Sequence, residues 1–151
     1  MMFTTHLAAG FLAGILTIPY LEPSNEILFL LFVLIGASLP DIDHPKSKVG
    51  KKVKIIAFLF EHRGFFHTLF ALALFAVLTE ILFQQRILTY GISIGYGSHL
   101  LTDLITKEGV MPFHPLSKQR LRGFFTTGGM LEYVLFLLLL AIDLYQLFRL
   151  Q

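Results

Sequence analysis

The sequence predicts an all-α integral membrane protein, a helical bundle of about five transmembrane helices with one short interfacial helix. Three observations lead to this prediction. Hydrophobic residues make up 55% of the 151 positions, and the mean hydropathy is +0.72. Charged residues make up only 15%, against about 25% in a typical soluble domain. The apolar residues also gather into stretches that approach or reach the roughly 20 residues that a bilayer-crossing helix needs.

Five apolar stretches define the predicted spans, at residues 3–21, 27–39, 65–83, 87–105 and 130–148. The second stretch is short for a span, so we expect it either to begin earlier, near Ser24, or to enter the bilayer only partway. The apolar piece at 53–60 is too short to cross and is predicted to lie at the interface or against the bundle. The length leaves room for one domain, so residues 1–151 are expected to form a single membrane-embedded helical domain.

Charge and cysteine content exclude several other classes of protein. The formal net charge of +2 is too small to indicate a nucleic-acid partner. The chain has no cysteine, which rules out disulfides and thiolate metal sites. No basic segment precedes the first apolar stretch, so a cleaved signal peptide is not expected.

The distribution of basic residues predicts the orientation in the membrane. If all five stretches cross, the amino terminus and the loops at 40–64 and 106–129 share one side. That side carries Lys46, Lys48, Lys51, Lys52, Lys54, Arg63, Lys107, Lys118, Arg120 and Arg122. The opposite side carries only Arg86 and Arg149. The positive-inside rule therefore places the basic side in the cytoplasm and the protein in the inner (cytoplasmic) membrane.

Metal-ligand side chains gather at the predicted cytoplasmic ends of these spans. They are His6, Asp41, Asp43, His44, His62, His67, His99, Asp103 and Glu132. Ionisable groups at membrane depth cost several kcal/mol unless they are paired, hydrated or coordinated, so they are functional candidates. His99 and Asp103 lie at positions i and i+4 of one helix and can hold a single ion. Gly91 and Gly95 extend the same face, and small residues at this spacing predict close helix packing.

The donor set indicates the kind of metal. Imidazole and carboxylate ligands without thiolate suit zinc, with manganese and iron as alternatives. The number of candidates allows one to three ions. A metal site of this type brings the pKa of bound water towards 7 and can clamp a phosphoester oxygen. Arg63 can add a forked hydrogen bond to a phosphate.

Each of these signals also has a structural interpretation. A single histidine in a membrane helix often serves as a hydrogen-bonding fastener between helices. Asp41, Asp43 and His44 also fit a turn followed by a helix cap. Separate structural roles would not require all these residues to lie on one side, so their convergence favours a metal site.

Three motifs carry a family resemblance. They are Leu-Pro-Asp-Ile-Asp-His-Pro at 39–45, His-Arg-Gly-Phe-Phe-His-Thr at 62–68 and Gly-Tyr-Gly-Ser-His-Leu-Leu-Thr-Asp at 95–103. In combination they resemble the YdjM-like family of inner-membrane-associated proteins, which are described as metal-dependent hydrolases. The resemblance implies a membrane-bound, metal-dependent hydrolase. Its polar motif positions are His6, Asp41, Asp43, His44, His62, Arg63, His67, His99, Asp103 and Glu132.

We therefore expect a metal-dependent hydrolase, phosphoesterase-like or phospholipase-like, that acts at the cytoplasmic face of the membrane. Metal-activated water would attack a lipid-like or other membrane-associated phosphoester. The expected core ligands are His62, His67, His99 and Asp103, and Asp41 and Asp43 bridge or complete the shell. The expected catalytic residues are Glu132 as a general base or additional ligand, Asp43, and Arg63, which would bind an anionic substrate group.

Two alternatives stay open. The first is a metal or proton transporter, although transporters commonly place their sites near the bilayer midplane between internal repeats. Here the candidate site lies at one edge and no repeat is evident. The second is a structural membrane protein whose polar cluster only fastens helices together.

Overall fold

A computed structural model describes residues 1–43 and 64–149, and within them all regular secondary structure is helical. The helices are α1 (Phe3–Leu21), α2 (Glu26–Ser38), α4 (Leu69–Phe83), α5 (Arg86–Leu104) and α6 (Met130–Arg149), with 3-10 turns η1 (Pro40–Asp43) and η3 (Phe65–His67). Two isolated β-bridges lie between α5 and α6. The all-helical prediction is confirmed for these residues. The predicted interfacial helix at 53–60 lies outside them.

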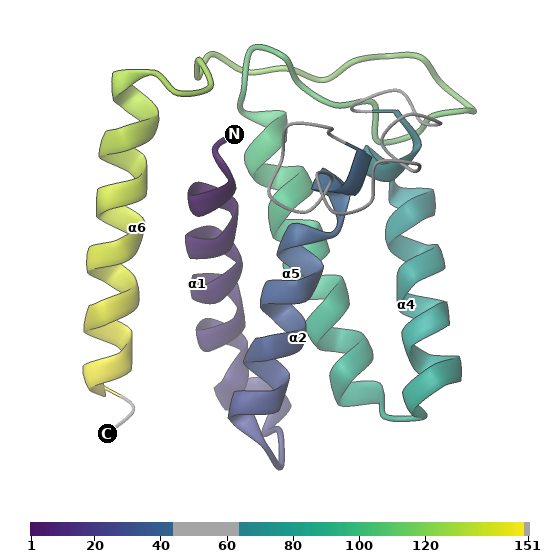
Figure 1. Ribbon diagram of the computed structural model, residues 1–151, viewed down its shortest axis with the longest axis vertical. Helices are drawn as coiled ribbons and strands as arrows, with labels where there is room; N and C mark the ends of the chain where they lie inside the picture. Colours follow the sequence, from purple (N-terminus) through teal and green to yellow (C-terminus); the bar gives the residue numbers. More distant parts are fainter. Residues whose placement is uncertain (44–63, 150–151) are drawn as a thin grey trace.

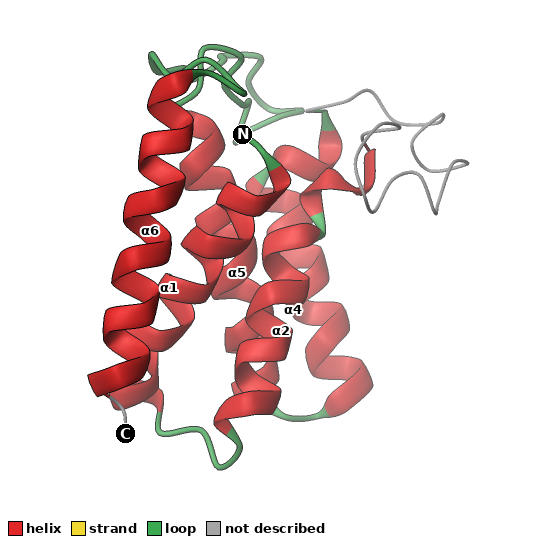
Figure 2. Cartoon of the chain, turned by 60° about the vertical axis from the view of Figure 1, so that its left-hand side comes forward, coloured by secondary structure: helices red, strands yellow, loops and turns green. Residues whose placement is uncertain are grey.

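The helices run up and down in alternating directions (Figure 1). α1, α4 and α6 begin at the end of the bundle where the amino terminus lies, and α2 and α5 finish there. α5 is central and contacts α1, α2 and α4, whereas α6 packs on α1 at the edge. The long connection between α5 and α6 passes over the same end of the bundle (Figures 1 and 2). We call this the loop end.

Small residues bring α2 and α5 into the most extensive helix contact of the bundle. A Cβ atom added to Gly95 would lie 1.9 Å from the carbonyl oxygen of Val33, and one added to Gly36 would lie 2.3 Å from that of Ile92. No larger residue fits at either position without moving a backbone. The predicted close packing of the Gly95 face is therefore confirmed, and α2 and α5 meet backbone to backbone.

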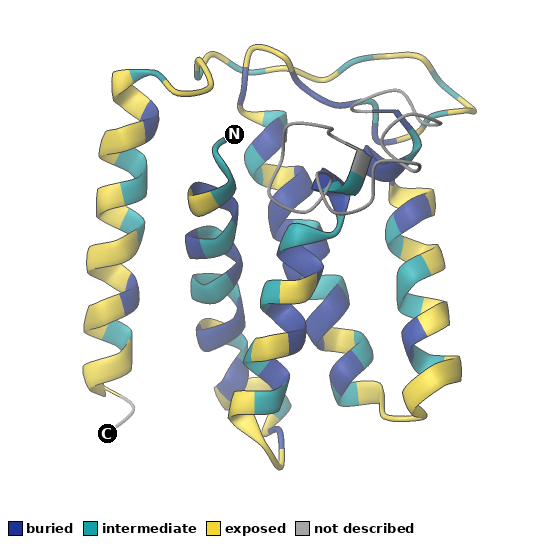
Figure 3. Cartoon of the chain, in the orientation of Figure 1, coloured by how far each residue is buried: buried dark blue, intermediate teal, exposed yellow. Residues whose placement is uncertain are grey.

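Among the described residues, α1 and α6 are long and apolar enough to cross a bilayer. α2 and α4 are apolar but shorter, at 13 and 15 residues. At about 1.5 Å per residue they reach roughly 20 Å, against about 30 Å of hydrocarbon. Exposed side chains run along α4 and α6 (Figure 3), and the large ones are mostly leucine, valine and phenylalanine. Apolar surface of this extent is typical of a membrane-facing or partner-facing helix.

The start of α4 differs from the predicted stretch at 65–83. Thr68 has extended backbone angles, φ −122° and ψ 159°, and its hydroxyl accepts a hydrogen bond from the backbone N–H of Ala71. Thr68 is therefore the N-cap that begins α4 at Leu69. The three residues before it form η3, and this turn directs the buried His67 into the bundle.

A candidate metal centre

Three histidines and two aspartates converge near the loop end of the bundle. His6 comes from α1, Asp41 from η1, His67 from η3, and His99 and Asp103 from α5. Each histidine and Asp103 is at most 1% exposed, and Asp41 is 8% exposed. The five side chains come from four segments that are far apart in the sequence, and all five were expected as ligands.

Asp103 lies at the centre of this cluster. Its Oδ1 atom is 3.5 Å from Nε2 of His6, and its Oδ2 atom is 3.5 Å from Nε2 of His67 and 3.8 Å from Nε2 of His99. Oδ1 of Asp41 is 3.9 Å from the same His99 nitrogen. All four distances exceed the roughly 3 Å of an ordinary hydrogen bond. The amino group of Met1 also donates to Oδ1 of Asp103.

Backbone and hydroxyl partners fix the protonation of two imidazole rings. Nδ1 of His99 lies 2.7 Å from the carbonyl oxygen of Ala37, which can only accept, so Nδ1 carries the hydrogen. Nδ1 of His6 lies 2.8 Å from the hydroxyl oxygen of Thr102. The single hydrogen of that hydroxyl is directed to the backbone carbonyls of Ser98 and His99 within α5, and in this arrangement Nδ1 of His6 donates to Thr102. In the neutral rings both Nε2 atoms therefore present lone pairs to the cluster.

In this cluster, hydrogen-bond acceptors of the imidazoles and of the carboxylates therefore face one another in the buried interior. Among the residues that the structure describes, Nε2 of His6 and Nε2 of His99 are buried and have no hydrogen-bond partner, and each faces a carboxylate oxygen. The amino group of Met1 donates to one oxygen of this carboxylate, but it gives no hydrogen bond to either Nε2 atom. A metal cation between the imidazoles and the carboxylate would satisfy those lone pairs. A tetrahedral ion with ligands at about 2.1 Å separates its ligand atoms by about 3.4 Å. The observed 3.5 and 3.8 Å fit such an ion.

The donor atoms form two overlapping groups of three, each with all its atoms within 4.8 Å of one another. One group is His6, His99 and Asp103, and the other is Asp41, His67 and His99. Because His99 belongs to both, the cluster has room for one ion or for a closely spaced pair. Nitrogen and oxygen donors in this proportion suit zinc, manganese or iron.

Ring packing supports the orientation of the histidines. The rings of His6 and His99 stack at 3.6 Å with an interplanar angle of 8°, and His67 meets His99 edge-on at 5.3 Å. The hydroxyl of buried Tyr96 donates to the carbonyl of Phe66 at 2.5 Å, which ties η3 to α5. These contacts hold His67 beside Asp103.

Glu132, expected as a ligand or general base, is buried but belongs to neither group. Its two oxygens accept backbone N–H groups, Oε1 from Met2 and Oε2 from Gly128, both at 2.6 Å. It therefore fastens the start of α6 to the residues before α1. The roles expected for Glu132 stay predictions.

The remaining expected residues cannot be placed in the cluster. His44, His62 and Arg63 lie outside the described residues, as does the side chain of Asp43. Sequence reasoning missed the two groups that orient the rings, Thr102 and the carbonyl of Ala37. For Thr102 the sequence contained one usable signal. It lies three residues after His99 on the same helix, a position from which a hydroxyl can orient a metal ligand.

Fold and cluster together define a helical protein with membrane-type surfaces and a candidate metal centre at one end of its bundle. The family model described as YdjM inner membrane protein matches residues 1–150. The chain belongs to the YdjM family, as its three motifs predicted.

Two relatives illustrate the similarity. The chain is 29% identical over 133 residues to the uncharacterized protein YvsG of Bacillus subtilis, a match that covers 85% of this chain and 82% of the relative. It is 45% identical over 83 residues to the inner membrane protein YdjM of Escherichia coli, covering 48% of this chain and 41% of the relative. The match to the Escherichia coli protein thus spans less than half of that protein. No solved structure matches the chain.

Proposed function

We propose that this chain is a membrane-embedded, metal-dependent hydrolase whose metal centre is the His6, Asp41, His67, His99 and Asp103 cluster. One observation carries the proposal. Two neutral imidazoles, with Nδ1 hydrogens held by Thr102 and Ala37, turn their Nε2 lone pairs onto a buried carboxylate. A cluster that only fastened helices would pair donors with acceptors instead.

In this proposal the cluster residues hold one or two divalent ions, with zinc as the first candidate. When bound, the metal supplies Lewis-acid activation of water and of the substrate oxygen. Thr102 and the Ala37 carbonyl keep the rings of His6 and His99 in their ligating orientation. The close contact of α2 with α5 lies beneath the cluster, so we propose that water and substrate enter from the loop end.

The proposed substrate is a lipid-like or other membrane-associated phosphoester. His6 is the fourth residue of α1, which places it about one helical turn, roughly 5 Å, from the start of that helix. A cluster at this depth lies near the headgroups if α1 spans the bilayer. Phosphoester oxygens are also the groups that paired metal ions clamp well.

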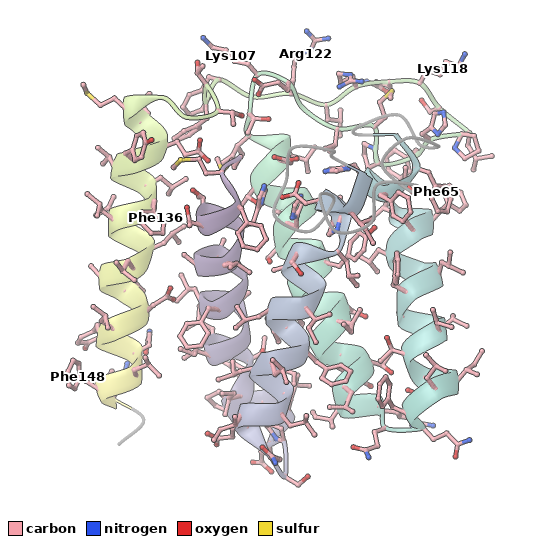
Figure 4. All side chains as sticks on the ribbon, viewed as in Figure 1. Phe65, Lys107, Lys118, Arg122, Phe136 and Phe148 are labelled. Atoms are coloured by element: carbon pink, nitrogen blue, oxygen red, sulfur yellow. The ribbon has the colours of Figure 1, made fainter. Side chains whose placement is uncertain are left out.

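We further propose that all five helices cross the membrane and that the loop end faces the cytoplasm. Lys107, Lys118 and Arg122 extend from the loop end (Figure 4). Arg86 is the first residue of α5 and Arg149 is the last residue of α6, so both belong to the end of the bundle opposite the loop end. This asymmetry follows the positive-inside rule. The short helices α2 and α4 cross if the bilayer thins locally around them, at a modest free-energy cost.

The test is elemental analysis of detergent-purified protein. We expect stoichiometric zinc, manganese or iron in the wild type, and its loss in His99→Ala and Asp103→Ala. His114→Ala is the matched control, because it removes a histidine outside the cluster and leaves the metal content unchanged. Circular dichroism of each variant separates the loss of metal from the loss of fold. A wild-type protein without metal would overturn the proposal.

A second measurement separates the hydrolase from a transporter. The metal-loaded protein is assayed on phospholipids and on generic phosphoesters, with and without chelator. Turnover that stops on chelation supports the hydrolase. Uptake of metal into proteoliposomes, without turnover of any phosphoester, supports transport and refutes hydrolysis.

A further inference from the structure

The connection between α5 and α6 contains a hairpin at residues 105–125. Val110 and Leu121 exchange two backbone hydrogen bonds of 2.9 Å, and the N–H of Lys107 donates to the carbonyl of Phe125 at 2.8 Å. These bonds pair the two arms, so residues 111–120 form the tip. The hairpin lies across the loop end of the bundle, and its tip reaches α4 (Figures 1 and 2).

The tip is fastened to α4 and is apolar on that side. The backbone N–H of Leu69, the first residue of α4, donates to the carbonyl of Pro112 at 2.9 Å. Phe113 lines a groove of about 300 Å³ together with Leu69, Phe70 and Ala73. Leu116, which belongs to the same tip, is 83% exposed. The groove continues the exposed apolar face of α4, which is the side that faces hydrocarbon if α4 lies in the bilayer.

The same tip is positively charged. Residues 111–120 contain Lys118 and Arg120 and no Asp or Glu. Lys118 is exposed and lies above α4, whereas Lys107 lies towards α6 (Figure 4). A tip that carries an exposed lysine and also lines an apolar groove complements an amphiphile with an anionic head and a hydrocarbon chain.

We propose that the hairpin tip and the outer face of α4 bind an anionic phospholipid. The acyl chain lies in the groove lined by Phe113 and Leu69, and the phosphate of the headgroup pairs with Lys118. The tip thereby anchors the hairpin at the membrane surface. This site lies on the exposed side of α4, whereas the cluster is buried, and the proposal does not depend on the proposed hydrolysis.

The chain has no tryptophan, so one introduced residue reports on a single place. The test uses the full-length Leu116→Trp variant in vesicles of phosphatidylcholine that carry equal fractions of brominated phosphatidylglycerol or brominated phosphatidylcholine. We expect blue-shifted emission, and stronger quenching by brominated phosphatidylglycerol. Gln119→Trp, an exposed position in the same tip, is the matched control and should be quenched much less.

The charge is tested in the same background. Lys118→Gln should lower the preference for phosphatidylglycerol by about fivefold, as expected for one basic residue at a membrane surface. Lys107→Gln makes the same charge change at the far part of the hairpin and should leave the preference unchanged. Water-exposed emission from Leu116→Trp, or equal quenching by the two brominated lipids, would overturn the proposal.

Discussion

Replacing Thr102 with valine tests how the candidate metal centre is oriented. Valine keeps the shape of threonine but removes the hydroxyl that accepts the Nδ1 hydrogen of His6 at 2.8 Å. The ring then has a buried, unsatisfied N–H, which costs about 1–3 kcal/mol. It can relieve this cost by moving the hydrogen to Nε2 and donating to Asp103. Either outcome weakens His6 as a ligand.

The expected loss of metal affinity is 10- to 100-fold, the usual range for a residue that orients a ligand. This corresponds to about 1.4–2.7 kcal/mol. Thr102 also bonds the carbonyls of Ser98 and His99, but both belong to the helix itself, so we expect little change in helix content. Metal affinity is measured by competition between the purified protein and a chromophoric chelator. Helix content is then measured by circular dichroism.

Two variants control this experiment. Thr17→Val removes a hydroxyl that bonds the carbonyls of Ala13 and Gly14 within α1, far from the cluster, and should not change metal affinity. Thr102→Ser restores the hydroxyl and should recover most of the affinity. If Thr102→Val binds metal as tightly as the wild type does, the hydrogen-bonding argument for the cluster is wrong.

Three further predictions follow from the structure. Gly95→Ala should destabilise the protein by about 3 kcal/mol or more, because the added Cβ would lie 1.9 Å from a carbonyl oxygen of α2. Gly97→Ala is the control and should be neutral in thermal melts, because its added Cβ would lie 4.0 Å from the nearest atom in the described part of the chain. Glu132→Gln should cost about 1–3 kcal/mol, since an amide cannot accept both backbone N–H groups, yet keep full metal content; loss of metal would instead make Glu132 a ligand. Chelation should lower the melting temperature by about 5–10 °C if free metal had been at 100 times its dissociation constant, and an unchanged melting temperature would argue against a bound ion.

The helices were largely predictable because apolar stretches mark them directly. The predicted stretch at 3–21 matches α1, and the stretch at 130–148 ends one residue before α6 does. The break before α4 was not predictable from hydropathy, since Phe65 and Phe66 are as apolar as the helix that follows. It depends on the hydroxyl of Thr68, which caps the helix and interrupts an apolar run that hydropathy reads as continuous.

The residues that form the cluster were predictable from the sequence, but the orientation of their side chains was not. Side-chain chemistry and topology bring His6, Asp41, His67, His99 and Asp103 to one end of the bundle, and the structure places these five together. The orientation of the His99 ring depends on the carbonyl of Ala37, a backbone group that every residue type carries and that the sequence therefore does not mark. Its position follows from the contact at Gly95, which brings α2 close enough to reach His99.

The candidate ligands are spread along the chain in an order that matters during synthesis. The first residue of the five-residue cluster, His6, leaves the ribosome early, but the last, Asp103, is made only after four of the five described helices have been started. No partial chain that ends before α5 can capture the ion with the full donor set. Metal loading would therefore be a late step of biogenesis and would report that α1, α2, α4 and α5 have assembled correctly.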